Sequence, residues 1–126
     1  MISDDDFLQL CKTGKAEAVR QAIEAGANVN ALDIHLRTPL MMAARFNPEV
    51  AVITALVEAG AEINARDKSG WTPLMFAARF SPEPAVIEVL IEKGADPELT
   101  DKTGKKAIDY AQSNPALQGN EVLDKL

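Results

Sequence analysis

The sequence is poor in the residue types that build most chemical sites. It contains one cysteine, one histidine, one tryptophan and one tyrosine among 126 residues, and aromatic residues make up only 5% of the chain. With Cys11 as the single cysteine, no internal disulfide can form, so nothing in the chain requires an oxidising compartment. With His35 as the single histidine, the usual His/Cys sets of zinc ligands cannot be assembled. We therefore predict no metal site and expect a reducing, cytoplasmic environment.

Positive charge is also scarce. The chain carries 13 Lys and Arg residues against 19 Asp and Glu residues, a formal net charge of −6. Nonspecific nucleic-acid binding depends on neutralising phosphates with basic side chains, so this balance argues against a nucleic-acid partner. No apolar run approaches the length of a membrane span, and residues 1–6 lack the basic and apolar regions of a secretory signal. We expect a cytoplasmic monomer without a membrane or nucleic-acid partner.

Catalytic motifs are missing as well. The chain has no Gly-rich phosphate loop and no recognisable pairing of a nucleophile with a base. The run Asp4-Asp5-Asp6 invites comparison with a cation site, but consecutive carboxylates are scattered around a helix, so a solvated helix start is favoured. We predict no catalytic residue and no cofactor, and hence that the protein is not an enzyme.

What the chain does contain is an internal repeat of 34 residues. Residues 33–66 and 67–100 are identical at 18 of 34 positions. The same spacing separates the pairs Gly26-Ala27, Gly60-Ala61 and Gly94-Ala95. A period in this range predicts a stacked array, because one unit cannot bury its own apolar face.

Each unit predicts two helices and an extended finger. The first helix begins at Thr38-Pro39 or Thr72-Pro73, where threonine caps and proline occupies the first helical position. The second begins after Asn47-Pro48-Glu49 or Ser81-Pro82-Glu83 and ends at a glycine. Residues 28–32 and 62–66 then run extended into hairpin-like fingers. Helices separated by such turns predict an all-α repeat solenoid.

The segments Thr38-Pro39-Leu40-Met41-Met42-Ala43 and Thr72-Pro73-Leu74-Met75-Phe76-Ala77 resemble the Thr-Pro-Leu-His-x-Ala signature of the ankyrin repeat family. The resemblance extends over nearly the whole chain. It implies a single domain, 1–126, in which two full repeats (33–66 and 67–100) lie between an N-terminal capping repeat (1–32) and a C-terminal capping repeat (101–126).

Three departures from the family pattern stand out. Methionines replace the signature histidine, so we expect apolar packing in place of its hydrogen bond. Each full unit is one residue longer than the 33-residue norm, as in a variant found among bacterial ankyrin proteins, and we interpret Phe46 and Phe80 as folding into the helix–helix turn. Leu36 occupies a turn position that normally needs positive φ, and the equivalent residues of the other fingers are Gly70 and Gly104. Either that turn is rebuilt or Leu36 is strained. Cys11, at the position of alanines in later units, is predicted to be a packed core residue.

The resemblance implies a non-catalytic module that binds a protein through the finger tips and the exposed side of the first helices, which line a concave face. The predicted partner-binding residues are Leu32, Ile34, His35, Leu36, Arg37, Arg45, Arg66, Lys68, Trp71, Arg79, Lys102 and Lys105. The whole face spans twenty positions, which are these residues except Leu36 together with Lys12, Thr13, Phe46, Ser69, Phe80, Thr100, Thr103, Ser113 and Asn114. They include eight basic residues and no acid, which predicts an acidic protein or peptide partner. Asp33, Asp67 and Asp101 lie beside them, so neutralisation by these carboxylates is the alternative.

Two features of this face leave alternatives open. Trp71 is either an interface anchor or a ring lying against the neighbouring finger. Leu32, Ile34 and Leu36 place three aliphatic residues at a normally polar finger tip, where a partner or dimer contact competes with a local rearrangement.

For the whole chain the alternative to a binding module is a stable scaffold, or an engineered consensus-like array, without a natural ligand. Irregularities such as Cys11, Leu36 and Pro84 favour a natural binder.

Overall fold

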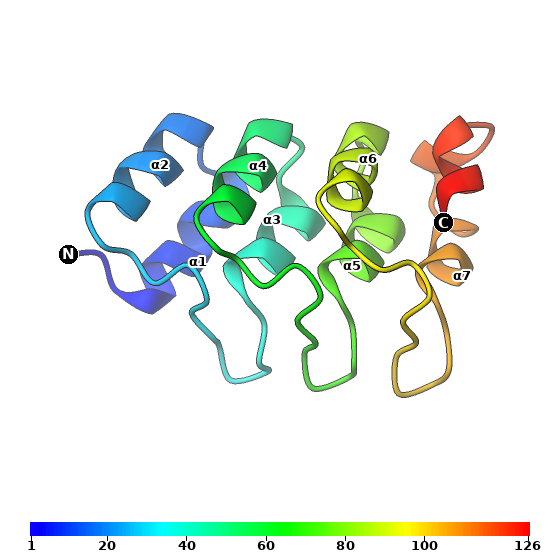
Figure 1. Ribbon diagram of the computed structural model, residues 1–126, viewed down its shortest axis with the longest axis horizontal. Coiled ribbons are helices and arrows are strands. Elements are labelled where there is room, and N and C mark those ends of the chain that lie inside the picture. The colour runs from blue at the N-terminus through cyan, green and yellow to red at the C-terminus, as the bar shows by residue number, and fades with distance from the viewer.

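The computed structural model describes all residues from 1 to 126 and contains only helices, turns and loops. The helices are α1 (Asp4–Thr13), α2 (Ala16–Glu24), α3 (Pro39–Phe46), α4 (Val50–Glu58), α5 (Pro73–Phe80), α6 (Pro84–Glu92) and α7 (Ala107–Ala111), followed by the 3-10 helices η1 (Pro115–Leu117) and η2 (Glu121–Lys125). Figure 1 shows successive pairs side by side, with the long loops projecting as fingers on one side. The predicted all-α repeat solenoid is confirmed.

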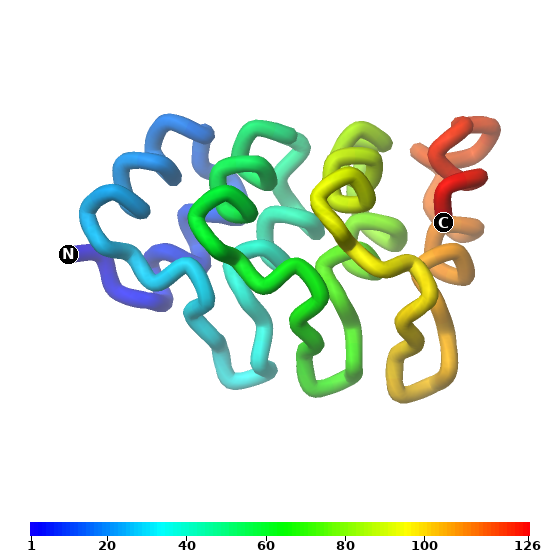
Figure 2. Tube along the Cα trace, viewed as in Figure 1, coloured from blue at the N-terminus to red at the C-terminus, as the bar shows by residue number.

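The helices form two rows. The inner row is α1, α3, α5 and α7, in which each helix packs against the next, and the outer row is α2, α4, α6 and η2. Figure 2 places the two chain ends at opposite ends of the stack. Residues far apart in the chain but equivalent in the repeat therefore lie next to each other, as an elongated array requires.

Helix starts follow the predicted capping chemistry. The Thr38 hydroxyl accepts a hydrogen bond from the Met41 N–H, and Thr72 does the same for Met75. Proline occupies the first helical position of α3, α5 and α6, where the missing N–H leaves no hydrogen bond unmade. Local sequence thus sets where α3 and α5 begin.

The core is built from small and flexible apolar side chains. Two alanines in each of α3 and α5 are fully buried, which allows the inner helices to approach closely. Met41, Met75 and Cys11 are also buried, as predicted. In the outer row, Val52, Ile53 and Leu56 are fully buried, whereas Val57 and Ile91 are only partly buried.

Each finger is organised by its first aspartate. The Oδ1 atom of Asp67 accepts hydrogen bonds from the N–H groups of Ser69 and Trp71, both at 2.9 Å. Asp33 and Asp101 hold their fingers in the same way. Neighbouring tips are joined by one backbone hydrogen bond each, from Lys68 to His35 and from Lys102 to Ser69. The fingers are hairpin-like, without a regular strand.

The loop between the two helices of a unit differs from the prediction. Phe46 and Phe80 are 43% and 39% exposed, so their rings do not fill the helix–helix turn. Asn47 fills it instead, and its side-chain amide donates to the carbonyl groups of Cys11 and Gly14 in the preceding unit, at 3.2 and 2.9 Å. The physical reason is that these carbonyls need donors when buried, and a phenyl ring has none to offer.

Leu36 adopts left-handed backbone geometry, with φ of 61°, and the turn is not rebuilt around it. Gly70 and Gly104 have φ of 81° at the equivalent turn. Because a side chain at positive φ costs about 1–2 kcal/mol, partly offset by the entropy of glycine in the unfolded chain, Leu36→Gly is expected to raise stability by about 1 kcal/mol. Thermal unfolding followed by circular dichroism measures this.

The control is the reverse change in the last finger. A Cβ at Gly104 would meet no atom within 4 Å, so Gly104→Ala tests strain without a clash. It should lower stability by a similar amount. An unchanged or lower melting temperature for Leu36→Gly would contradict the strain at this position.

Candidate functional site

Two hollows include predicted partner-binding residues in their lining. The first has a volume of about 270 Å³ and is lined by Arg37, Arg45, Asp67, Ser69, Trp71, Phe76 and Phe80. The second, of about 330 Å³, is lined by Asn30, Leu32, Leu36, Thr38, Glu62, Ala65 and Arg66. The structure therefore brings Arg37, Arg45 and Trp71 together, while Leu32, Leu36 and Arg66 form a separate group.

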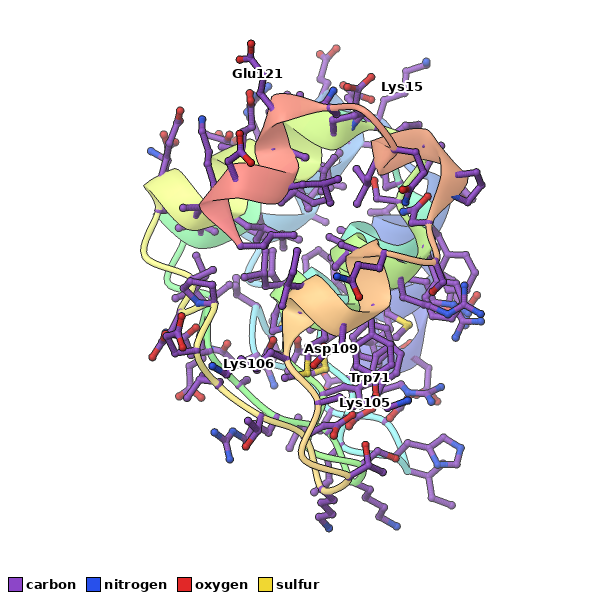
Figure 3. All side chains as sticks on the ribbon, turned by 90° about the vertical axis from the view of Figure 1, so that its right-hand side faces the viewer. Lys15, Trp71, Lys105, Lys106, Asp109 and Glu121 are labelled. Carbon is purple, nitrogen blue, oxygen red and sulfur yellow. The ribbon has the colours of Figure 1, made fainter.

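The aromatic wall of the first hollow consists of Trp71, Phe76 and Phe80, and Tyr110 packs against Trp71. The Trp71 ring centre lies 4.4 Å from that of Tyr110, 5.1 Å from Phe76 and 6.1 Å from Phe80. Trp71 thus packs against the next unit and still presents part of its surface to the hollow. Figure 3 shows Trp71 and Lys105 on the same side of α7. Phe76 belongs to the same unit as Trp71, whereas Tyr110 comes from the next unit, and the spacing of the repeat alone does not indicate that these rings meet.

A row of alternating basic and aromatic side chains crosses α1, α3 and α5. The Lys12 ammonium lies 5.3 Å from the centre of the Phe46 ring. The Arg45 guanidinium lies 4.8 Å from Phe46 and 4.3 Å from Phe80, and Arg79 lies 5.3 Å from Phe80. We call these five residues the cation–ring ladder. Attraction between a cation and the face of a ring fixes the direction of each basic side chain.

The ladder cations have no acidic partner. Salt bridges involve Arg37 with Asp67 at 3.5 Å and two lysines outside the face. Arg37 is therefore the one basic residue of the predicted face that is paired with a carboxylate. Its Nε atom is buried and has no hydrogen-bond partner. The proposed neutralisation by finger aspartates applies to Arg37 by direct pairing, whereas Lys12, Arg45 and Arg79 are left available.

The first aspartate of each finger accepts hydrogen bonds mainly from backbone N–H groups of the same finger. Burial alone would raise the pKa of Asp101, but hydrogen bonds from Tyr110, Thr103 and the Lys105 N–H outweigh it and lower the pKa to about 2. Burial, followed by the hydrogen bond to Asp101, raises the pKa of Tyr110. Asp101 therefore stays ionised and Tyr110 stays protonated, which suits the hydrogen bond that the Tyr110 hydroxyl donates to the Asp101 carboxylate. This is a structural arrangement that holds Tyr110 beside Trp71.

Other ionisable groups offer little chemistry. Burial raises the pKa of the Cys11 thiol to about 12, so it is not an activated nucleophile. No three side chains of His, Cys, Asp or Glu come together as a group that could hold a metal ion. What the face offers to a ligand is positive charge and aromatic surface.

The first finger is the most exposed apolar element. Ile34 is 78% exposed, and Leu32 and Leu36 are exposed beside it. Ile34 and the exposed His35 line neither hollow. The second hollow, which Leu32 and Leu36 border, opens next to this tip.

The remaining predicted residues are distributed along the fingers. The Lys105 ammonium lies 5.8 Å from the Tyr110 ring centre, close to the aromatic wall. Lys68 and Lys102 are exposed at finger tips and line no hollow. Asn114, which the resemblance placed on the face, is buried and donates to the carbonyls of Ala78 and Ser81.

A family model described as ankyrin repeats (3 copies) matches residues 7–67 and 49–124. The comparison with curated proteins finds no match. None of the helices is both long enough and apolar enough to span a bilayer.

Proposed function

The chain belongs to the ankyrin repeat family, whose repeats are in general protein–protein interaction modules, and from this premise we propose that it is a non-catalytic module for an acidic protein surface or peptide. The observation that carries the proposal is the cation–ring ladder, whose basic side chains are oriented by rings and lack acidic partners. Oriented charges of one sign attract a partner of the other sign and select its position.

The distribution of charge over the whole chain supports this preference. Eight of the 13 basic residues occupy the predicted face, and all 19 acidic residues lie outside its twenty positions. The remainder of the molecule is therefore strongly negative. An acidic partner is repelled by those surfaces and attracted by the face, which favours one mode of docking.

The alternative is a stable scaffold without a natural ligand. The left-handed Leu36 and the exposed aliphatic finger tip favour the binding module, because both features lower stability or solubility and contribute nothing to a bare scaffold. We further propose a monomer in a reducing compartment such as the cytoplasm, since its one thiol is buried and free, without a nucleic-acid or membrane partner.

Charge reversal tests the proposed face. The double variant Arg45→Glu/Arg79→Glu is expected to weaken capture of partners from an extract of the source organism at least tenfold, because two attractive charges become repulsive ones. Quantitative affinity capture against the wild type measures the loss. Capture should also fall as salt rises from about 50 to 300 mM, over which screening becomes stronger.

The matched control is Arg20→Glu/Lys93→Glu, which makes the same change in net charge at two exposed positions away from the face. It should capture the same proteins as the wild type. Trp71→Ala removes the centre of the aromatic wall without changing charge, and is expected to weaken capture as well. If all variants capture the same proteins equally, the proposed face is wrong.

A further inference from the structure

The basic side chains of the ladder recur at equivalent positions along the stack. Arg45 and Arg79 both contact the Phe80 ring, so their guanidinium carbons are at most 9.6 Å apart, the sum of 4.3 and 5.3 Å. Through Phe46, the Lys12 ammonium and the Arg45 guanidinium are at most 10.1 Å apart, the sum of 5.3 and 4.8 Å. The three residues occupy equivalent positions on adjacent helices, whose axes typically lie about 8–10 Å apart. The interval between successive cations is therefore at most about 10 Å and of the order of the helix spacing, about 8–10 Å.

Only some backbone conformations present side chains at that interval on one side. A β-strand places same-face side chains about 6.7 or 13.4 Å apart, from its rise of about 3.3–3.4 Å per residue. A polyproline II helix has three residues per turn and a rise of about 3.1 Å, so every third side chain lies on one side at intervals of about 9.3 Å. This interval falls within the range of about 8–10 Å set by the stacked helices, which neither strand interval does.

The rings between the cations favour the same conformation. Phe46 and Phe80 are substantially exposed and lie between successive basic groups. Polyproline II segments dock on exposed aromatic surfaces, with their prolines against the rings. A segment lying along the ladder would place acidic side chains on the cations and prolines on the rings.

Resting on the proposed function, we infer that the partner segment is a polyproline II stretch that carries an acidic residue at every third position and crosses α1, α3 and α5. The inference names the conformation and the spacing of the acids, which an acidic partner in general does not need. Both parts of the ladder then have a role: the cations bind the acidic side chains, and the rings contact the residues between them.

Three twelve-residue peptides of identical composition test the spacing. Each contains four glutamates and eight prolines, blocked at both ends and labelled with a fluorophore. In the first peptide a glutamate occupies every third position, in the second every second position from one end, and in the third the four glutamates are consecutive. Net charge and composition are the same, and in the first two peptides every glutamate precedes a proline, which biases it towards polyproline II. The ratio of their Kd values, from fluorescence anisotropy at low salt, therefore reports spacing, and the third peptide tests the effect of clustered charge.

The first peptide is expected to bind about tenfold tighter than its two isomers. Arg45→Glu/Arg79→Glu should abolish this difference, and Arg20→Glu/Lys93→Glu should preserve it. Equal Kd values for the three isomers would contradict the inferred spacing of acidic residues without contradicting the proposal of an acidic partner. A helical peptide with glutamates seven residues apart that bound more tightly would overturn the conformation.

Two further outcomes would contradict the proposed function itself. If none of the peptides binds even at low salt, the acidic partner falls together with the spacing. If a single-stranded oligothymidylate of the same length binds more tightly than the best peptide, the positive face serves phosphates and the protein partner is wrong.

Discussion

Replacing Asn47 by alanine is expected to lower the free energy of unfolding by about 3 kcal/mol. The buried side-chain amide donates to the carbonyls of Cys11 and Gly14, and its Oδ1 accepts from the Glu49 N–H. Alanine removes all three hydrogen bonds and leaves two carbonyls of the preceding unit without these donors. Urea unfolding followed by circular dichroism measures the loss.

The effect should be concentrated at one interface of the stack. In a repeat array each unit contacts only its neighbours, so weakening the bond between the first two units loosens the terminal one first. Amide hydrogen exchange in Asn47→Ala is therefore expected to accelerate most in α1 and α2. Uniform acceleration along the chain would contradict a local fastening role.

Ser81 supplies the matched control because it occupies the equivalent position in the next unit and is also buried. Its hydroxyl bonds only to the backbone of Glu83, two residues away, and reaches no neighbouring unit. Ser81→Ala should cost less than about 1 kcal/mol. If Asn47→Ala costs no more than this, the bonds between units contribute little.

The fold was predictable because its determinants are local and recur in phase. Thr38 and Thr72 cap helices through bonds that span three residues, and the glycines that end the outer helices take positive φ within their own turns. The strain at Leu36 was visible for the same reason, since alignment with Gly70 identifies the turn position. A period read from the sequence captures such features without knowledge of the third dimension.

The helix–helix turn was predicted wrongly because its bonds join different units. Phe46 and Phe80 are identical between the two copies, which drew attention to the rings, while Asn47 aligns with Ser81 and so looked variable. The donor that fills the turn reappears only as Asn114 in the last unit. The available signal was that asparagine recurs at positions 47 and 114, in the units before and after the one that carries Ser81.

The charges of the candidate site could be predicted from the sequence, but the alternation of basic side chains with rings could not. Basic residues such as Arg45 and Arg79 could be placed on one face from the family resemblance alone. Their alternation with rings depends on contacts such as that between Arg45 and Phe80, which belong to adjacent helices. Periodicity places equivalent residues side by side, but it does not tell which side chain lies between two others.

The second large effect is expected at alkaline pH, where the wild-type protein should lose stability through Cys11. The unfolded thiol loses its proton near pH 9, whereas burial holds the pKa of the folded thiol at about 12. Between these values the unfolded chain binds fewer protons than the native one, so stability falls as pH rises. Each factor of ten in proton affinity corresponds to about 1.4 kcal/mol, which gives a loss of about 3 kcal/mol by pH 11.

Cys11→Ala isolates this contribution because alanine is the residue at the equivalent positions 44 and 78 and suits the same packing. Urea unfolding between pH 8 and pH 11 is expected to give a free energy that declines more steeply for the wild type than for Cys11→Ala. Lysines and tyrosine titrate in both proteins, so the difference between the two curves belongs to the thiol. Parallel curves would show that the thiol titrates alike in both states.

Alkylation provides a second measurement of the same burial. At a pH below both values, the thiolate fraction of the native protein should be about a thousandfold smaller than that of the unfolded chain, because the two pKa values of 9.0 and about 12 differ by three. Since Cys11 is also fully inaccessible, modification by iodoacetamide should proceed only through opening of the first unit. Asn47→Ala, which loosens that unit, should then increase the rate of modification of Cys11. A native thiol that reacts as fast as a free one, with or without Asn47, would contradict both the burial of Cys11 and the fastening of α1.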